Sequence, residues 1–188
     1  MNHFYTNLGE NWFSYSLLYE NMVKRFPSNS HFVEVGTWKG MSACFMAVEI
    51  INSNKRIKFD CVDTWEYVPT SIDICESLYD DLYDVFVKNI EPVKNNINII
   101  RSISWDGAKE YKDNSLDFVF LDAGHDYESV KKDISSWFPK MKSSGIIAGH
   151  DYHNNGTCKV RKAVDEFFEG RNEKVEQFPG GCWTYNLK

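Results

Sequence analysis

The sequence contains no apolar run near the length that crosses a bilayer, and its first residues lack the basic-then-apolar pattern of a secretion signal. Positive charge is also in short supply, since 27 acidic residues outnumber 21 lysines and arginines and give a net charge of −6. Such a balance argues against a nucleic-acid-binding surface. We therefore expect a cytoplasmic chain that has neither a membrane nor a nucleic acid as its partner.

Cysteines are few, scattered and odd in number, and no two of them form a C-x-x-C motif. Cys44 and Cys61 fall inside apolar segments that are predicted to be a helix and a strand, so both are expected to be small core residues. This pattern argues against disulfides or a zinc site, and it agrees with a cytoplasmic location.

The chain also lacks repeats, low-complexity segments and a convincing linker, so we expect one domain over residues 1–188. Apolar runs alternate with helical patterns, as in βαβ units that build a mostly parallel sheet. The predicted strands are His31–Val35, Ile57–Val62, Ile97–Arg101, Leu116–Leu121 and Gly145–Ala148. After the turn at 179–181, Trp183, Tyr185 and Leu187 alternate with other residues, which predicts a closing hairpin.

Two segments fall outside this alternation. The N-terminal segment, residues 1–28, is predicted to contain a helix over about 11–26. That helix is expected to turn Phe13, Leu17, Val23 and Phe26 inward. Residues 64–90 are longer than a simple crossover, with Pro69 in the first half and a helical pattern in the second. We interpret this segment as a lid or substrate segment, the alternative being a structural insertion.

Residues 31–40 (HFVEVGTWKG) place a β-branched strand and a glycine turn directly before an apolar helical pattern. Glycines let the backbone approach a ligand, and the following helix offers free N–H groups. The G-x-G-x-x-G of dinucleotide-binding folds is missing, and E-x-G-x-x-x-G stands in its place. The carboxylate would repel a pyrophosphate but suits a ligand with an ammonium group, such as S-adenosylmethionine. The candidate cofactor contacts in this turn are Glu34, Gly36, Thr37 and Gly40; the alternative is an ordinary strand–turn–helix unit.

Polar residues also follow the second and third predicted strands. Asp63 ends the second strand, with Thr64 beside it, and a carboxylate there can accept hydrogen bonds from both hydroxyls of an adenosine ribose. The alternative is a capping or turn aspartate. The stretch RSISWDGA at 101–108 is expected to border the adenine. Its candidates for holding the base are Ser102, Ser104, Trp105 and Asp106.

The fourth and fifth strands end in Asp122 and in His150-Asp151, and neighbouring strands would bring these groups to one rim of the sheet. Two carboxylates and an imidazole could hold a divalent cation; the oxygens favour Mg²⁺ or Mn²⁺, and His150 favours a transition metal. Alternatively, Asp122 faces the cofactor while His150 and Asp151 cap the next turn. His125 could accept a proton from a hydroxyl or only cap a helix, and Asp126 is the expected N-cap.

Together these motifs resemble those of class I S-adenosylmethionine-dependent methyltransferases over nearly the whole chain. EVGTWKG at 34–40 is similar to their first motif, and Asp63 to their ribose-binding acid. Residues 115–152, together with the triplet 63–65, are similar to small O-methyltransferases that tailor macrolides and other sugar-bearing natural products. The resemblance implies an α/β fold with a doubly wound, Rossmann-like, mostly parallel sheet. That sheet would have seven strands, the last of them antiparallel, and helices on both faces.

More distantly, Asp122 and the acid after the fifth strand match metal-binding positions of catechol O-methyltransferase, and His125 takes the place of its lysine base. The resemblance thus implies His125 and Asp122 as catalytic residues and Asp122, His150 and Asp151 as metal ligands. The predicted function is methyl transfer from S-adenosyl-L-methionine to a hydroxyl of a small molecule or sugar, with Mg²⁺ or Mn²⁺ as a candidate cofactor. A homo-oligomer is compatible with the sequence.

Three other functions stay open. A non-catalytic Rossmann-like binding or scaffold protein would keep the fold without the chemistry. A nicotinamide-dependent oxidoreductase is disfavoured by the missing third glycine and by Glu34. Hydrolysis or hydroxylation at the same metal site would need turnover without S-adenosylmethionine.

Overall fold

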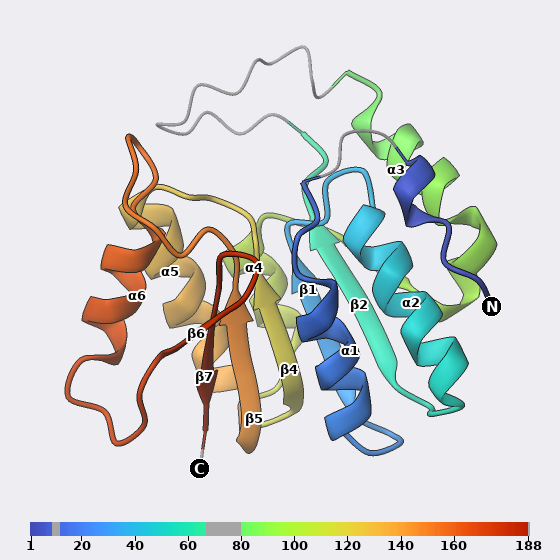
Figure 1. Cartoon of the computed structure of the whole chain (residues 1–188). Coiled ribbons are helices and arrows are strands. Elements are labelled where there is room, and N and C mark those ends of the chain that lie inside the picture. The colour runs from blue at the N-terminus through green and yellow to red at the C-terminus, as the bar shows by residue number, and fades with distance from the viewer. Residues whose placement is uncertain (9–11, 67–79, 188) are drawn as a thin grey trace.

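Seven strands form one sheet in the order β3-β2-β1-β4-β5-β7-β6 (Figure 1). The computed structural model describes residues 1–8, 12–66 and 80–187. The strands are β1 (His31–Val35), β2 (Lys58–Asp63), β3 (Asn98–Arg101), β4 (Leu116–Leu121), β5 (Met141–Gly149), β6 (Glu176–Phe178) and β7 (Cys182–Asn186). β1 to β5 pair in parallel, whereas β7 runs antiparallel to β5 and β6. The predicted mostly parallel, Rossmann-like sheet is confirmed.

Helices cover both faces of the sheet (Figure 1). On one face lie α1 (Ser16–Arg25), α2 (Met41–Ser53) and α3 (Leu82–Ile90); on the other lie α4 (Ser104–Gly107), α5 (Tyr127–Trp137) and α6 (Val160–Phe168). Short 3₁₀ turns complete the described elements: η1 (Tyr5–Asn7), η3 (Glu91–Asn96), η4 (Ala108–Glu110) and η5 (Phe138–Lys140). In the described ranges, no helix combines the length and the apolar character that crossing a membrane would require.

Strand β1 shows how the sequence supplies both cores. Phe32 packs into the core with α1, α2 and α3, whereas Val33 and Val35 pack into the core with α5 and α6. Side chains along a strand point alternately to opposite faces, so a strand covered on both faces is apolar throughout. Glu34 breaks this rule, because it is completely buried on the Phe32 face. Cys44 and Cys61 are buried free thiols of the same core, as predicted.

The N-terminal helix is shorter than predicted, although Val23 and Phe26 are buried as predicted and Phe13 packs against the core. α1 begins at Ser16 rather than near residue 11, and residues 13–15 are not helical. Leu17, which was predicted to face inward, is 49% exposed, so this prediction was wrong. The true buried face is formed by Leu18, Tyr19, Met22 and Val23. Residues 13–15 add no helical turn, and Ser14 and Tyr15 instead contact His150 and Asp122 at the ends of β5 and β4.

The predicted lid or substrate segment at 64–90 is described only in part, since residues 67–79 lie outside the described residues. Its second half is helical as predicted: α3 buries Leu82, Phe86 and Ile90 in the core that it shares with α2. Strand β5 is longer than predicted and begins at Met141.

The order of the strands fixes where a ligand can bind. The chain leaves β1 toward β2 and β3 on one side, and later continues through β4 and β5 on the other. The loops that follow β1 and β4 therefore part from each other at the carboxyl ends of the strands. Ligands of open α/β sheets bind in the crevice at such a switch point.

Candidate active site

A cavity of about 600 Å³ lies at this switch point. Its size falls within the range of pockets that bind small molecules and cofactors. Eleven of the predicted site residues line it, namely Gly36, Thr37, Asp63, Thr64, Ser102, Ser104, Trp105, Asp122, His125, His150 and Asp151. The three that do not are Glu34, Gly40 and Asp106. The sheet thus brings together residues that are spread over more than 100 positions of the sequence.

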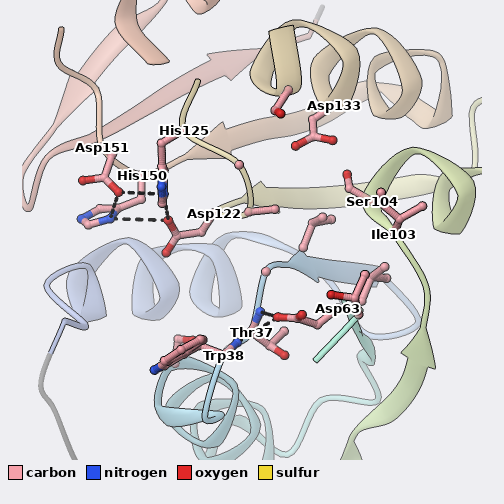
Figure 2. A pocket seen from close by; sticks show the side chains of 18 of the residues that line it. Thr37, Trp38, Asp63, Ile103, Ser104, Asp122, His125, Asp133, His150 and Asp151 are labelled. Atoms are coloured by element: carbon pink, nitrogen blue, oxygen red, sulfur yellow. Dashed lines mark hydrogen bonds and ion pairs between the residues drawn. The ribbon is translucent and has the colours of Figure 1, made fainter. Parts of the chain in front are cut away.

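Asp63 connects the loops after β1 and β2 (Figure 2). Its Oδ2 accepts hydrogen bonds from the backbone N–H groups of Thr37 (2.8 Å) and Trp38 (3.0 Å), and its Oδ1 accepts one from Trp65 N–H (2.9 Å). Burial raises the pKa of Asp63, and these N–H groups oppose that rise. The carboxyl group is therefore held in one orientation on the cavity wall, where it can receive further donors. Thr64 lies beside it and donates its hydroxyl proton to Glu66 O (3.0 Å).

Gly36 is required by the close approach of two loops. Its φ is +84°, and a Cβ at this position would lie 2.1 Å from the backbone oxygen of Asp122. A side chain would therefore push the turn after β1 away from the end of β4. Gly40, also at φ +84°, is the N-cap of α2, and its nearest neighbour would be the Phe86 ring.

Glu34 is completely buried and does not line the cavity. Its Oε1 accepts a hydrogen bond from Ser42 Oγ (2.5 Å), while its Oε2 has no partner among the described residues. Burial raises the pKa of Glu34 to about 8, so the group is mostly neutral at pH 7. A neutral Glu34 cannot attract the ammonium group of a ligand in the way that the sequence suggested. Ser42 does line the cavity and connects Glu34 to it indirectly.

Four side chains from the ends of β4 and β5 form an acid–imidazole cluster: Asp122, His125, His150 and Asp151 (Figure 2). His125 Nε2 lies 3.0 Å from Asp151 Oδ2 and 3.5 Å from Asp122 Oδ1. His150 Nδ1 lies 3.2 Å and 3.6 Å from the same two oxygens. The predicted convergence of these groups at one rim of the sheet is thus what the fold produces.

Charges in this cluster stabilise one another. Burial alone would lower the pKa of His125 and of His150, but hydrogen bonds and Coulomb attraction from Asp122 and Asp151 raise each to about 10. Burial alone would raise the pKa of Asp122 and of Asp151. The two imidazoles have the larger effect, so the pKa of both acids is lowered. In this state the cluster therefore contains two imidazolium ions and two carboxylates.

The same atoms have the spacing of a metal site. One ligand atom each of Asp122, His125 and Asp151 lie within 4.8 Å of one another. His150 is oriented like a metal ligand, because its Nε2 lies 3.0 Å from Gly180 O, which can only accept. Nε2 therefore carries the hydrogen, and in the neutral ring the Nδ1 lone pair faces both carboxylates. Carboxylates with imidazoles fit Mn²⁺ or another first-row transition metal better than Mg²⁺.

On the far side of the cavity, the residues after β3 lie as expected with one exception. Ser102, Ser104 and Trp105 line the cavity. Asp106, one of the open choices for holding the base, does not line it and pairs with Lys109 (2.6 Å) at the surface. Asp126 is the N-cap of α5, as predicted, and accepts hydrogen bonds from two backbone N–H groups.

Sequence reasoning missed two parts of the wall. The first is Asp133 on α5, which is only 3% exposed and lines the cavity. It was detectable as a charge on the apolar face between Val130, Ile134 and Trp137. The second is an aromatic wall formed by Trp12, Phe13, Tyr15 and Trp38. Its first three members gave no signal because they were assigned to a helix.

Sequence comparison places the chain in a family. The family described as "Methyltransferase domain" matches residues 33–152, which is more than half of the chain, so the chain belongs to it. Together with the Rossmann-like sheet, this makes it a class I S-adenosylmethionine-dependent methyltransferase. The matched range contains the Gly36 turn, Asp63 and the whole acid–imidazole cluster. No curated protein matches the sequence.

Several solved structures share the fold at low identity. The O-methyltransferase NovP has a TM-score of 0.68 at 15% identity, over 92% of this chain and 79% of its own. A Clostridium thermocellum protein described as an rRNA methylase has a TM-score of 0.67 at 12% identity, over 93% of this chain and 97% of its own. A Streptococcus mutans protein described as a methyltransferase, solved in complex with SAH, has a TM-score of 0.64 at 12% identity, over 94% of this chain and 98% of its own. These likenesses show that the chain shares the fold of methyltransferases that act on different acceptors.

Proposed function

We propose that the chain methylates a hydroxyl group of a small molecule, such as a sugar, with a divalent cation bound at the acid–imidazole cluster. The observation that carries this proposal is the position of the cluster. Asp122 is a member of the acid–imidazole cluster, and its backbone lies directly against Gly36 of the cofactor turn. An acceptor held at the cluster would therefore sit beside the cofactor, which is the first requirement for in-line methyl transfer.

The residues of the cavity divide naturally between the parts of S-adenosylmethionine. Asp63 would accept hydrogen bonds from the ribose hydroxyls, since its carboxyl group is already held by the backbone of Thr37 and Trp38. Ser102 and Ser104 would border the adenine. The methionine end would lie along the Gly36–Thr37 turn, with Glu34 acting only through Ser42.

The acceptor hydroxyl must lose its proton as the methyl group arrives. Asp122, His150 and Asp151 would hold the cation, which when bound would lower the pKa of a coordinated hydroxyl. His125 would then accept the proton through Nε2, because it lines the cavity and contacts both acids. For this role its ring must first become neutral, which a cation beside it would favour by repulsion.

The aromatic wall would form the acceptor side of the site. Trp12 is 58% exposed and stacks on Trp38, with ring centroids 5.6 Å apart. Both rings line the cavity, and Tyr15 OH donates to Asp122 Oδ2 (3.0 Å). Flat apolar rings beside polar groups suit a sugar or a phenolic ring, each of which presents an apolar face and hydroxyl groups.

Calorimetric titration with S-adenosylmethionine, with and without Mn²⁺ and with NAD as a control, tests the cofactor assignment. Micromolar binding should be lost in Asp63→Ala and kept in Asp106→Ala, which changes an acid of α4 that lies outside the cavity. Hydroxylated acceptors can then be screened by mass spectrometry for a gain of one methyl group. Transfer to nitrogen or carbon alone would contradict the O-methylation proposal, and absence of binding would favour the scaffold alternative.

A further inference from the structure

The two carboxylates of the acid–imidazole cluster each turn one oxygen inward and the other outward. Asp122 Oδ1 and Asp151 Oδ2 are the inner oxygens, and both lie 3.0 to 3.6 Å from the two imidazoles of the cluster (Figure 2). Asp122 Oδ2 accepts a hydrogen bond from Tyr15 OH (3.0 Å) instead. Asp151 Oδ1 lies 3.3 Å from His153 Nε2. A cation at the centre of the cluster would therefore meet one oxygen of each acid.

Tyr15 holds the outer oxygen of Asp122 from a fixed position. Its side chain belongs to the core shared with α1, α2 and α3 and is only 4% exposed. The centroid of its ring lies 4.5 Å from that of Phe120 and 4.7 Å from that of Phe13. A turn of the Asp122 carboxylate that brought both oxygens inward would break a hydrogen bond to a charged group and leave a buried hydroxyl without its acceptor.

His153 holds the outer oxygen of Asp151 in a similar way. Its Nδ1 accepts a hydrogen bond from Asn155 N–H (3.4 Å), so Nε2 carries the hydrogen and faces Asp151 as a donor. The His153 side chain is 42% exposed and does not line the cavity, which separates it from the two imidazoles of the cluster. Its contact with the cluster is thus to the outer oxygen of Asp151.

We propose that Tyr15 and His153 restrict the two acids to one inner oxygen each and thereby make the cluster select a small cation such as Mn²⁺ over Ca²⁺. Ca²⁺ takes about six to eight oxygens and often both oxygens of one carboxylate, whereas smaller octahedral cations need fewer. Tyr15 and His153 are positioning residues, because both act through the acids. This inference rests on the proposed cation site.

Calorimetric titrations with Mn²⁺ and with Ca²⁺ at pH 8.5 test it. The wild-type protein should bind Mn²⁺ about 100-fold more tightly. An imidazole ligand also favours Mn²⁺, so the decisive quantity is the change of this ratio on substitution. Tyr15→Phe removes only the hydroxyl, and the ratio should fall about tenfold because Ca²⁺ binds more tightly. Tyr19→Phe is the matched control, since Tyr19 is a neighbouring buried tyrosine outside the cavity and should keep the wild-type ratio.

His153→Ala tests the same claim at Asp151 and should also lower the ratio. Its side chain is partly exposed, so this variant decides even if Tyr15→Phe does not fold. Equal affinity of the wild-type protein for both cations overturns the inference, and so does an equal loss of both cations in Tyr15→Phe, which marks a merely structural role. Either result leaves the cation site itself intact. Failure of both cations to bind the wild-type protein overturns the inference together with the proposed cation site.

Discussion

Binding of Mn²⁺ to the acid–imidazole cluster should release protons, and their number can be worked out from the structure. His125 and His150 each have a pKa of about 10, so both rings are protonated at pH 7.5. An imidazole that ligates a metal must be neutral. Removing the proton from one such ring at pH 7.5 costs about 3.5 kcal/mol, since each pKa unit corresponds to roughly 1.4 kcal/mol. The apparent affinity for Mn²⁺ should therefore rise about tenfold per pH unit and per released proton between pH 7 and 9.

Calorimetry in several buffers that differ in ionisation enthalpy measures the proton count directly. We expect between one and two protons per Mn²⁺: one from His150 as a ligand, and a further fraction from His125, whose pKa the cation lowers. His150→Asn should weaken the binding of Mn²⁺ and lower the number of released protons by one. His125→Asn should still bind Mn²⁺ and should lower that number only by the fraction of a proton that His125 contributes. His3→Asn is the matched control, because His3 pairs with Glu49 outside the cavity. Binding without proton release would refute imidazole ligation, and absence of binding by Mn²⁺ and Mg²⁺ would refute the cation site.

Three further predictions concern single residues. Gly36→Ala should lower the free energy of unfolding by roughly 2–4 kcal/mol in urea titrations, since its Cβ would overlap the Asp122 backbone; a loss below about 0.5 kcal/mol would contradict this. Glu34 keeps its proton up to a pKa of about 8 when folded, whereas the unfolded chain releases it near pH 4. Its contribution to stability is thus complete below about pH 4 and lost as pH rises through 8. Between pH 5 and 9 the wild-type protein should lose about 4 kcal/mol more of its free energy of unfolding than Glu34→Gln, and parallel pH profiles would refute the raised pKa. Trp12→Ala should raise the acceptor KM roughly three- to tenfold with an unchanged Kd for the cofactor; a change in both would place Trp12 in the cofactor site.

Local patterns were sufficient to predict most of the sheet. β1 and β4 match their predicted bounds, because strands covered on both faces read as continuous apolar runs. The positions of Asp63, Asp122 and Asp151 followed from the rule that parallel strands end at one rim. No distance between these groups was needed for that prediction.

What the sequence did not reveal depends on contacts between distant segments. The charge of Glu34 could not be predicted, because its pKa follows from complete burial beside Ser42. The helical pattern near Leu17 suggested a longer helix, since nothing local shows that residues 13–15 instead contact the ends of β4 and β5. Asp133 looked like one more acid of a charged chain until the fold placed it inside the cavity.

The contacts of residues 14 and 15 have a consequence for how such an enzyme can change its substrate. Ser14 Oγ donates to Gly180 O (2.8 Å) and lies 3.0 Å from His150 Nε2, while Tyr15 bonds to Asp122. Under the proposed function the acceptor wall would be fastened at these two points, and the exposed side chain of Trp12 lies next to them, whereas Phe13 packs against the core. If this wall selects the acceptor as proposed, residue 12 is the position at which a substitution would change the acceptor with the least effect on the core and on the carboxyl group of Asp63.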